Sequence, residues 1–146
     1  MTPPLTPTAA AVPESRAYVF DRDRRTAALA RHQVRADLTD WKVPEERIES
    51  AVQVVSEIAT NAVEHTQSMR IRLEVERHPE EIRIAVRDSG PRPQAPLDTY
   101  LTAPADLAEG GRGLLLVQLL AARWGAEPTP GNGLRVWAAI PAGDQQ

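Results

Sequence analysis

The chain contains no cysteine among its 146 residues, so it can form neither disulfides nor thiolate zinc sites. This absence is typical of proteins of the reducing cytoplasm, which is the compartment we expect. No apolar run approaches the roughly 20 residues that a membrane-spanning helix needs, so no membrane association is expected. The net charge is −3 and there is no long basic run, which disfavours nucleic-acid binding.

Proline is concentrated at the start of the chain, where four of the 13 prolines precede Glu14. This composition predicts a disordered lead over residues 1–15. The remaining length fits one domain, which we place at residues 16–141, followed by a short tail at 142–146. The hydrophobic content of 42% and the charged content of 25% are sufficient for a packed core with a solvated surface.

Two helices are predicted early in the domain, after a short strand at residues 16–21. The first starts near Arg24 and repeats apolar residues on one side, namely Ala27, Ala30, Val34, Leu38 and Trp41. The second follows Pro44, which is favoured in a first helical turn, and acidic residues come next near the positive end of the helix dipole. Its apolar residues keep the helical period as far as about Thr66.

The period then changes from helical to alternating. Apolar and charged residues alternate over residues 69–76, 82–86 and 134–140, so each strand buries one face only. A third helix is expected from near Gly113 to near Trp124, with a short strand at 126–129. The fold class is therefore α/β (α+β): a two-layer sandwich with a mixed, mostly antiparallel sheet of about five strands and about three helices on one face.

A row of polar residues runs along the second helix. Glu57, Asn61 and His65 are spaced four residues apart, so they stack on one face of that helix. A carboxylate, an amide and an imidazole in one row fit a binding or catalytic site. They fit a solvated helix face equally well, and the row alone does not distinguish the two.

Two further motifs allow functional interpretations. Asp88-Ser89-Gly90 ends a strand, where a buried carboxylate can accept a hydrogen bond from the exocyclic amine of a base; a plain turn favours the same residues. The segment Gly110–Leu114 opens a helix, where glycines permit close approach and free N–H groups face an anion. A flexible connector ending at a helix start is the other interpretation. The intervening residues 91–109 are rich in proline, and a loop this long is usually functional or mobile.

The order of these motifs is more specific than any one of them. A helix with Glu-x-x-x-Asn comes first, a strand ending in Asp-x-Gly second, and Gly-x-Gly at a helix start third. This arrangement resembles the Bergerat-type (GHKL) ATP-binding domain of gyrase, a heat-shock chaperone and sensor histidine kinases. The Asn-Ala-x-x-His sequence at Asn61 and the chain length are most similar to anti-sigma-factor serine/threonine kinases of the partner-switching type. The resemblance covers residues 16 to 140.

The resemblance implies a role for each motif residue. Asn61 would hold Mg²⁺ against the triphosphate of ATP, and Glu57 would act as the general base on the attacking hydroxyl. Asp88 would accept from the adenine amine, and Gly90 would line the adenine pocket. The phosphates would be bound at the start of the third helix, by Gly111, Arg112, Gly113 and Leu114. Residues 91–109 would form the lid.

One position departs from the family pattern. Relatives often begin the last strand with Gly-Lys-Thr, and the threonine helps to line the adenine site. Here the stretch is Gly133-Leu134-Arg135-Val136-Trp137, so Arg135 replaces the threonine in this alignment. We therefore expect Arg135 to affect the binding of adenine.

Two functions fit the sequence. The first is an anti-sigma factor in transcription regulation, a Mg-ATP-dependent kinase that transfers the γ-phosphoryl group to a serine or threonine of an anti-anti-sigma (STAS-like) partner. The second is a non-catalytic, ATP-sensing module that sequesters a partner such as a sigma factor. Relatives commonly form homodimers. Neither a two-component sensor nor a gyrase-like ATPase is expected, because we find neither an upstream helix with a phosphoacceptor histidine nor a second domain.

Overall fold

The computed structural model describes residues 14–90 and 111–142, which are built around one five-stranded sheet in the order β1-β2-β3-β5-β4. All four neighbouring strand pairs are antiparallel. The predicted, mostly antiparallel sheet is thereby confirmed, and every pairing in the described part of the chain follows it. The strands are β1 (Glu14–Asp21), β2 (Arg70–Arg77), β3 (Glu81–Asp88), β4 (Arg123–Thr129) and β5 (Gly133–Pro141).

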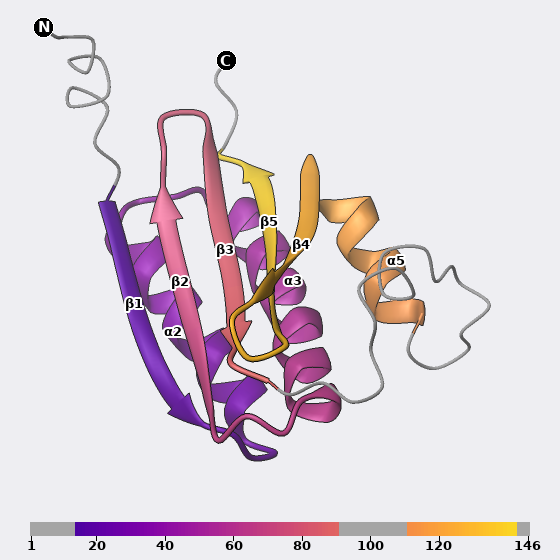
Figure 1. The fold of residues 1–146 in the computed structure, drawn as a ribbon. Helices are drawn as coiled ribbons and strands as arrows, with labels where there is room; N and C mark the ends of the chain where they lie inside the picture. Colours follow the sequence, from indigo (N-terminus) through magenta and orange to yellow (C-terminus); the bar gives the residue numbers. More distant parts are fainter. Residues whose placement is uncertain (1–13, 91–110, 143–146) are drawn as a thin grey trace, which may run out of the picture.

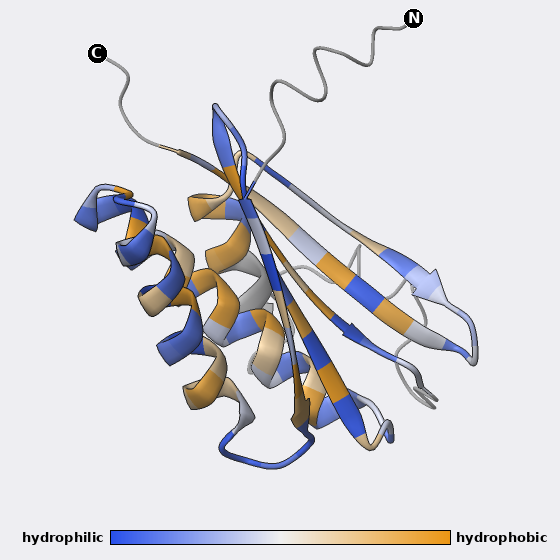
Figure 2. Ribbon diagram, turned by 90° about the vertical axis from the view of Figure 1, so that its left-hand side faces the viewer, coloured by the Kyte–Doolittle hydropathy of each residue, from blue (hydrophilic) through white to orange (hydrophobic). Residues whose placement is uncertain are grey.

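Three helices, α2 (Thr26–Asp40), α3 (Glu45–His65) and α5 (Gly111–Leu120), complete the described fold. The helices α2 and α3 lie behind the sheet in Figure 1, and α5 stands beside α3 next to β4. Figure 2 shows the helices and the sheet as two layers, with hydrophobic segments, in orange, recurring along both. This is the two-layer sandwich predicted from the alternating strands, and the helices cover one face as expected.

The core lies between these layers. In β2 and β3 every second residue is buried, so their apolar side chains point toward α2 and α3, whereas the charged ones, except Asp88, stay outside. The helices contribute their predicted apolar stripes. The largest fully buried side chains are Val34, Leu38, Ile48, Val54, Val55, Ile58, Ile71, Leu73, Val75, Ile82, Ile84 and Ile140.

A buried polar network fixes α2 on the sheet. The Asp37 carboxylate is 1% exposed and accepts hydrogen bonds from Arg16 Nη1 at 2.7 Å and from the Tyr18 hydroxyl at 2.8 and 2.9 Å. Burial of Tyr18 and its hydrogen bonds to Asp37 raise the pKa of the phenol above its usual value. Because a buried carboxylate is tolerated only when it is paired and hydrogen-bonded, this network ties β1 to α2.

Some boundaries differ from those expected from the sequence. β1 is described from Glu14 and α5 from Gly111, so each element includes at least two residues before the start that we expected from the sequence. The largest difference is at Trp124, which we expected at the end of a helix. It lies in β4, because α5 ends at Leu120 and Trp124 packs against the core from the strand.

Three predicted segments fall partly or wholly outside the described residues: most of the lead at 1–15, the lid at 91–109, and most of the tail at 142–146. Within the described residues, no helix has the length and apolarity needed to cross a bilayer.

Candidate functional site

The helix α3 carries the first part of the candidate site. Its buried stripe packs on the sheet, whereas Glu57 and Asn61 lie one turn apart on a partly exposed flank. The Asn61 Oδ1 atom is buried and has no hydrogen-bond partner among the described residues. A buried acceptor without a partner costs about 1–3 kcal/mol, so this oxygen is suited to a partner that is not part of the protein. His65, the last residue of α3, is exposed.

Asp88 carries the second part, at the end of β3. It is 1% exposed, and its Oδ1 atom accepts hydrogen bonds from the Thr66 hydroxyl at 3.0 Å, the Gly90 N–H at 2.9 Å and the Leu134 N–H at 3.3 Å. These donors come from the end of α3, the residues after β3 and the start of β5. One carboxylate oxygen therefore joins three segments that lie far apart in the sequence.

Gly90 is required by its surroundings. Its φ of +77° is in the left-handed region, and a Cβ there would lie 2.6 Å from the Gly133 backbone nitrogen. The reciprocal constraint holds at Gly133, where a Cβ would lie 2.6 Å from the Gly90 backbone nitrogen. The end of β3 thus packs directly on the turn between β4 and β5. This close approach of two backbones explains the glycine at position 90 without any ligand.

The third part is the start of α5. This helix is described from Gly111, so the residues Arg112, Gly113 and Leu114 belong to its first described turn. The N–H groups of a first helical turn have no intrahelical acceptor and favour an anion. The helix contacts α3 and, less extensively, β4, so its start belongs to the same side of the molecule as α3 (Figure 1).

Thr66 and Thr129 were not predicted to belong to the site, yet both contact Asp88. The Thr66 hydroxyl reaches the carboxylate, and the Thr129 hydroxyl donates to the Asp88 main-chain oxygen at 2.9 Å. Both threonines are buried. In the sequence, each threonine is only a polar residue near the end of a helix or strand. Such residues are too common to indicate a binding site.

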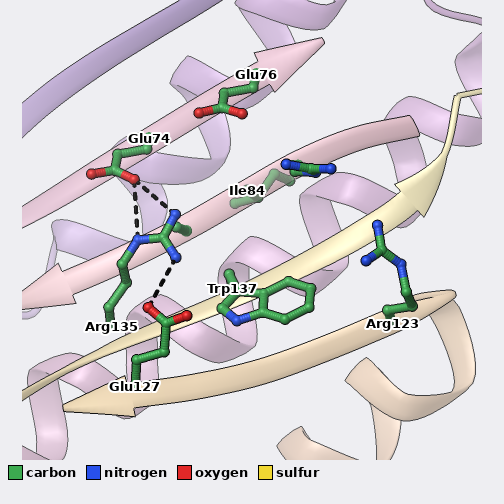
Figure 3. A pocket seen from close by; sticks show the side chains of 9 residues that line it. Glu74, Glu76, Ile84, Arg123, Glu127, Arg135 and Trp137 are labelled. Atoms are coloured by element: carbon green, nitrogen blue, oxygen red, sulfur yellow. Dashed lines mark hydrogen bonds and ion pairs between the residues drawn. The ribbon is translucent and has the colours of Figure 1, made fainter. Parts of the chain in front are cut away.

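Arg135 lies on the opposite face of the sheet from Asp88. In β5 the buried Leu134 and Val136 face the helices, so Arg135 and Trp137 face outward. Figure 3 shows the Arg135 guanidinium between two carboxylates, Glu74 at 3.1 Å and Glu127 at 3.6 Å. These residues line a hollow of about 240 Å³ on the outer face. The residue of this strand that meets Asp88 is Leu134, so the expected influence of Arg135 on adenine has no direct structural basis.

Comparisons with known proteins agree with this architecture. One chain in the crystal structure of the SiaB–SiaC complex from Pseudomonas aeruginosa has a similar fold, with a TM-score of 0.66 over 93% of this chain and 94% of that chain, at 11% sequence identity. No curated protein sequence matches significantly. The family model described as "Histidine kinase-like ATPase domain" matches residues 20–138, which include α3, the Asp88 turn and α5. The chain therefore belongs to the family of histidine kinase-like ATPase domains.

Proposed function

We propose that this protein is an ATP-binding regulator, an anti-sigma factor that transfers the γ-phosphoryl group of ATP to a serine or threonine of an anti-anti-sigma (STAS-like) partner. The observation that carries the proposal is the buried Asn61 Oδ1 atom, which lacks a partner among the described residues and lies one turn from the Glu57 carboxylate. Membership in an ATPase-domain family supports the same nucleotide.

The adenine end of the nucleotide is assigned to Asp88. Its Oδ1 atom is fixed by three donors, so the orientation of the carboxylate is set before any ligand arrives. A carboxylate held in this way selects a base that offers an amine, as adenine does. The phosphates are assigned to the first described turn of α5, where Gly111 and Gly113 have no side chain to block close approach and the helix dipole attracts an anion.

Mg²⁺ fits the chemistry of Asn61. An amide oxygen is a hard ligand that suits this ion, and the Oδ1 atom of Asn61 has no other described partner. Mg²⁺ bound there would supply charge neutralisation at the phosphate oxygens.

The proposed reaction transfers the γ-phosphoryl group from ATP to the partner hydroxyl. The partner hydroxyl oxygen forms a bond to the γ-phosphorus, the bond from that phosphorus to the bridging oxygen breaks, and ADP leaves. The Glu57 carboxylate takes the hydroxyl proton. Because such transfers depend on alignment and charge, the main contribution of the protein is to hold Glu57 and Asn61 on one rigid helix.

We further propose that the substrate of the transfer is a protein. A chain of similar fold occurs in a complex named for two proteins, SiaB and SiaC. A fold of this kind can therefore take part in a protein–protein complex, and we assign the same use to the present chain.

The substitution Asn61→Ala tests the nucleotide and metal assignment. We expect the wild-type protein to bind ATP at least about tenfold more tightly with Mg²⁺ than without, and we expect the variant to lose this difference. Isothermal titration calorimetry measures both affinities. The fold should persist, because Asn61 Oδ1 makes no described hydrogen bond. Gln67→Ala, which removes an exposed amide just beyond α3, is the control and should behave like the wild type. A Mg²⁺ effect of wild-type size in Asn61→Ala would contradict the assignment.

A further inference from the structure

A second hollow, of about 250 Å³, lies beside Glu57 and is separate from the one on the outer sheet face. It is formed by all three described helices. Its lining residues are Arg31 from α2, Val52, Gln53, Ser56 and Glu57 from α3, and Leu116 from α5. Glu57 is the only one of these residues to which the proposed function gives a role.

The hollow extends from Glu57 away from the proposed nucleotide. Along α3, Gln53, Glu57 and Asn61 follow one another at steps of four residues, which is roughly 6 Å of helix each. Gln53 lines the hollow and Asn61 does not. With the triphosphate at Asn61, Glu57 therefore stands between the phosphates and the hollow. This is the position that a base needs between a phosphoryl donor and a hydroxyl acceptor.

Arg31 places a guanidinium at a hollow whose described lining also includes one carboxylate, Glu57. Its side chain is half-buried, and its Nη1 atom donates to the Ser56 hydroxyl at 3.0 Å. No carboxylate of the described residues pairs with it, whereas Arg35, one turn later on α2, contacts Glu45 at 2.8 Å and Glu49 at 2.9 Å. A guanidinium offers five N–H donors, so most of those of Arg31 are available for an anionic group entering the hollow.

We propose that this hollow is the acceptor site for the protein partner. It receives a segment whose serine or threonine hydroxyl reaches Glu57 and whose neighbouring acidic side chain pairs with Arg31. Val52 and Leu116 supply apolar contact at its wall. This assignment rests on the proposed kinase function and adds to it a substrate class, a hydroxyl residue flanked by carboxylates. Arg31 is then a specificity-determining residue, which selects the acceptor and takes no part in proton transfer.

Reversal of the charge at Arg31 tests the acceptor site. The probes are two serine peptides of equal length, one with aspartates and one with lysines next to the serine, and the readout is transfer of labelled γ-phosphate. For the wild type we expect kcat/KM to favour the acidic peptide by about tenfold, mainly through KM. Arg31→Glu should invert this preference, and Arg31→Lys should keep it. The control Arg24→Glu changes an exposed arginine outside the hollow and should leave the preference intact.

The experiment distinguishes failure of the acceptor site from failure of the kinase function. Transfer with the same peptide preference in wild type and Arg31→Glu would overturn the acceptor site and leave the kinase function standing. Binding of Mg-ATP without transfer to either peptide would overturn the kinase function and the acceptor site with it. The ATP affinity of each variant, measured by calorimetry, should equal that of the wild type, which shows that the fold and nucleotide site are intact.

Discussion

The substitution Glu57→Gln is expected to lower the rate of phosphoryl transfer by about 10²–10⁴-fold while leaving the affinity for Mg-ATP unchanged. Glutamine keeps the shape of the side chain but cannot accept the proton of the attacking hydroxyl. The rate is measured as transfer of labelled γ-phosphate to the acidic serine peptide under single-turnover conditions, and the affinity is measured by calorimetry.

Glu64→Gln is the matched control for this experiment. Glu64 is an exposed carboxylate on the same helix that does not line the hollow at Glu57. It should retain the wild-type rate. If Glu57→Gln transfers phosphate as fast as the wild type, Glu57 is not the base. If the wild type binds Mg-ATP but transfers nothing, the ATP-sensing module that sequesters its partner becomes the better account.

The substitution Asp88→Asn is expected to change the choice of nucleotide. The amide oxygen of asparagine can still accept the N–H groups of Gly90 and Leu134, so the strand ends stay joined. The second carboxylate oxygen is replaced by the amide NH2 group, a donor that cannot accept from the adenine amine and instead suits a carbonyl. We expect ATP to bind roughly 10–100-fold more weakly and inosine triphosphate, which carries a carbonyl there, to bind relatively better.

Competition between ATP and inosine triphosphate for a fluorescent nucleotide analogue measures this change in preference. Asp40→Asn is the control, since Asp40 is an exposed carboxylate that pairs with Arg16 and lies at the end of α2. An unchanged preference for ATP in Asp88→Asn would show that Asp88 has only its structural role in joining β3 to the turn before β5.

Much of the architecture could be predicted because it depends on periodicity. The strands alternate buried and charged residues, which places the three described helices on one side, and α3 repeats its apolar stripe from Ile48 to Ala62. Reliance on periodicity also explains why the predicted end of α5 was wrong. The apolar sequence continues past Leu120, so the period could not show that the chain turns into a strand before Trp124.

The placement of a candidate residue was predictable where that residue sits on a regular element. Glu57 and Asn61 lie one turn apart as their spacing required, and Asp88 is buried at the end of β3. The expected effect of Arg135 on adenine came from alignment to a family motif, whereas its own strand places Arg135 on the outward face, since neighbouring residues in a strand face opposite sides. Thr66 and Arg31 could not be identified, because their contacts depend on how separate elements pack.

In the proposed function, ATP binds between the end of α3, the end of β3 and the start of α5. Amide hydrogen exchange with and without Mg²⁺ and a non-hydrolysable ATP analogue tests this location directly. We expect slower exchange at residues 57–66, 88–90 and 111–117 when the analogue is bound. Slower exchange confined to residues 72–76 and 135–137 on the outer sheet face, or no change anywhere, would contradict the account.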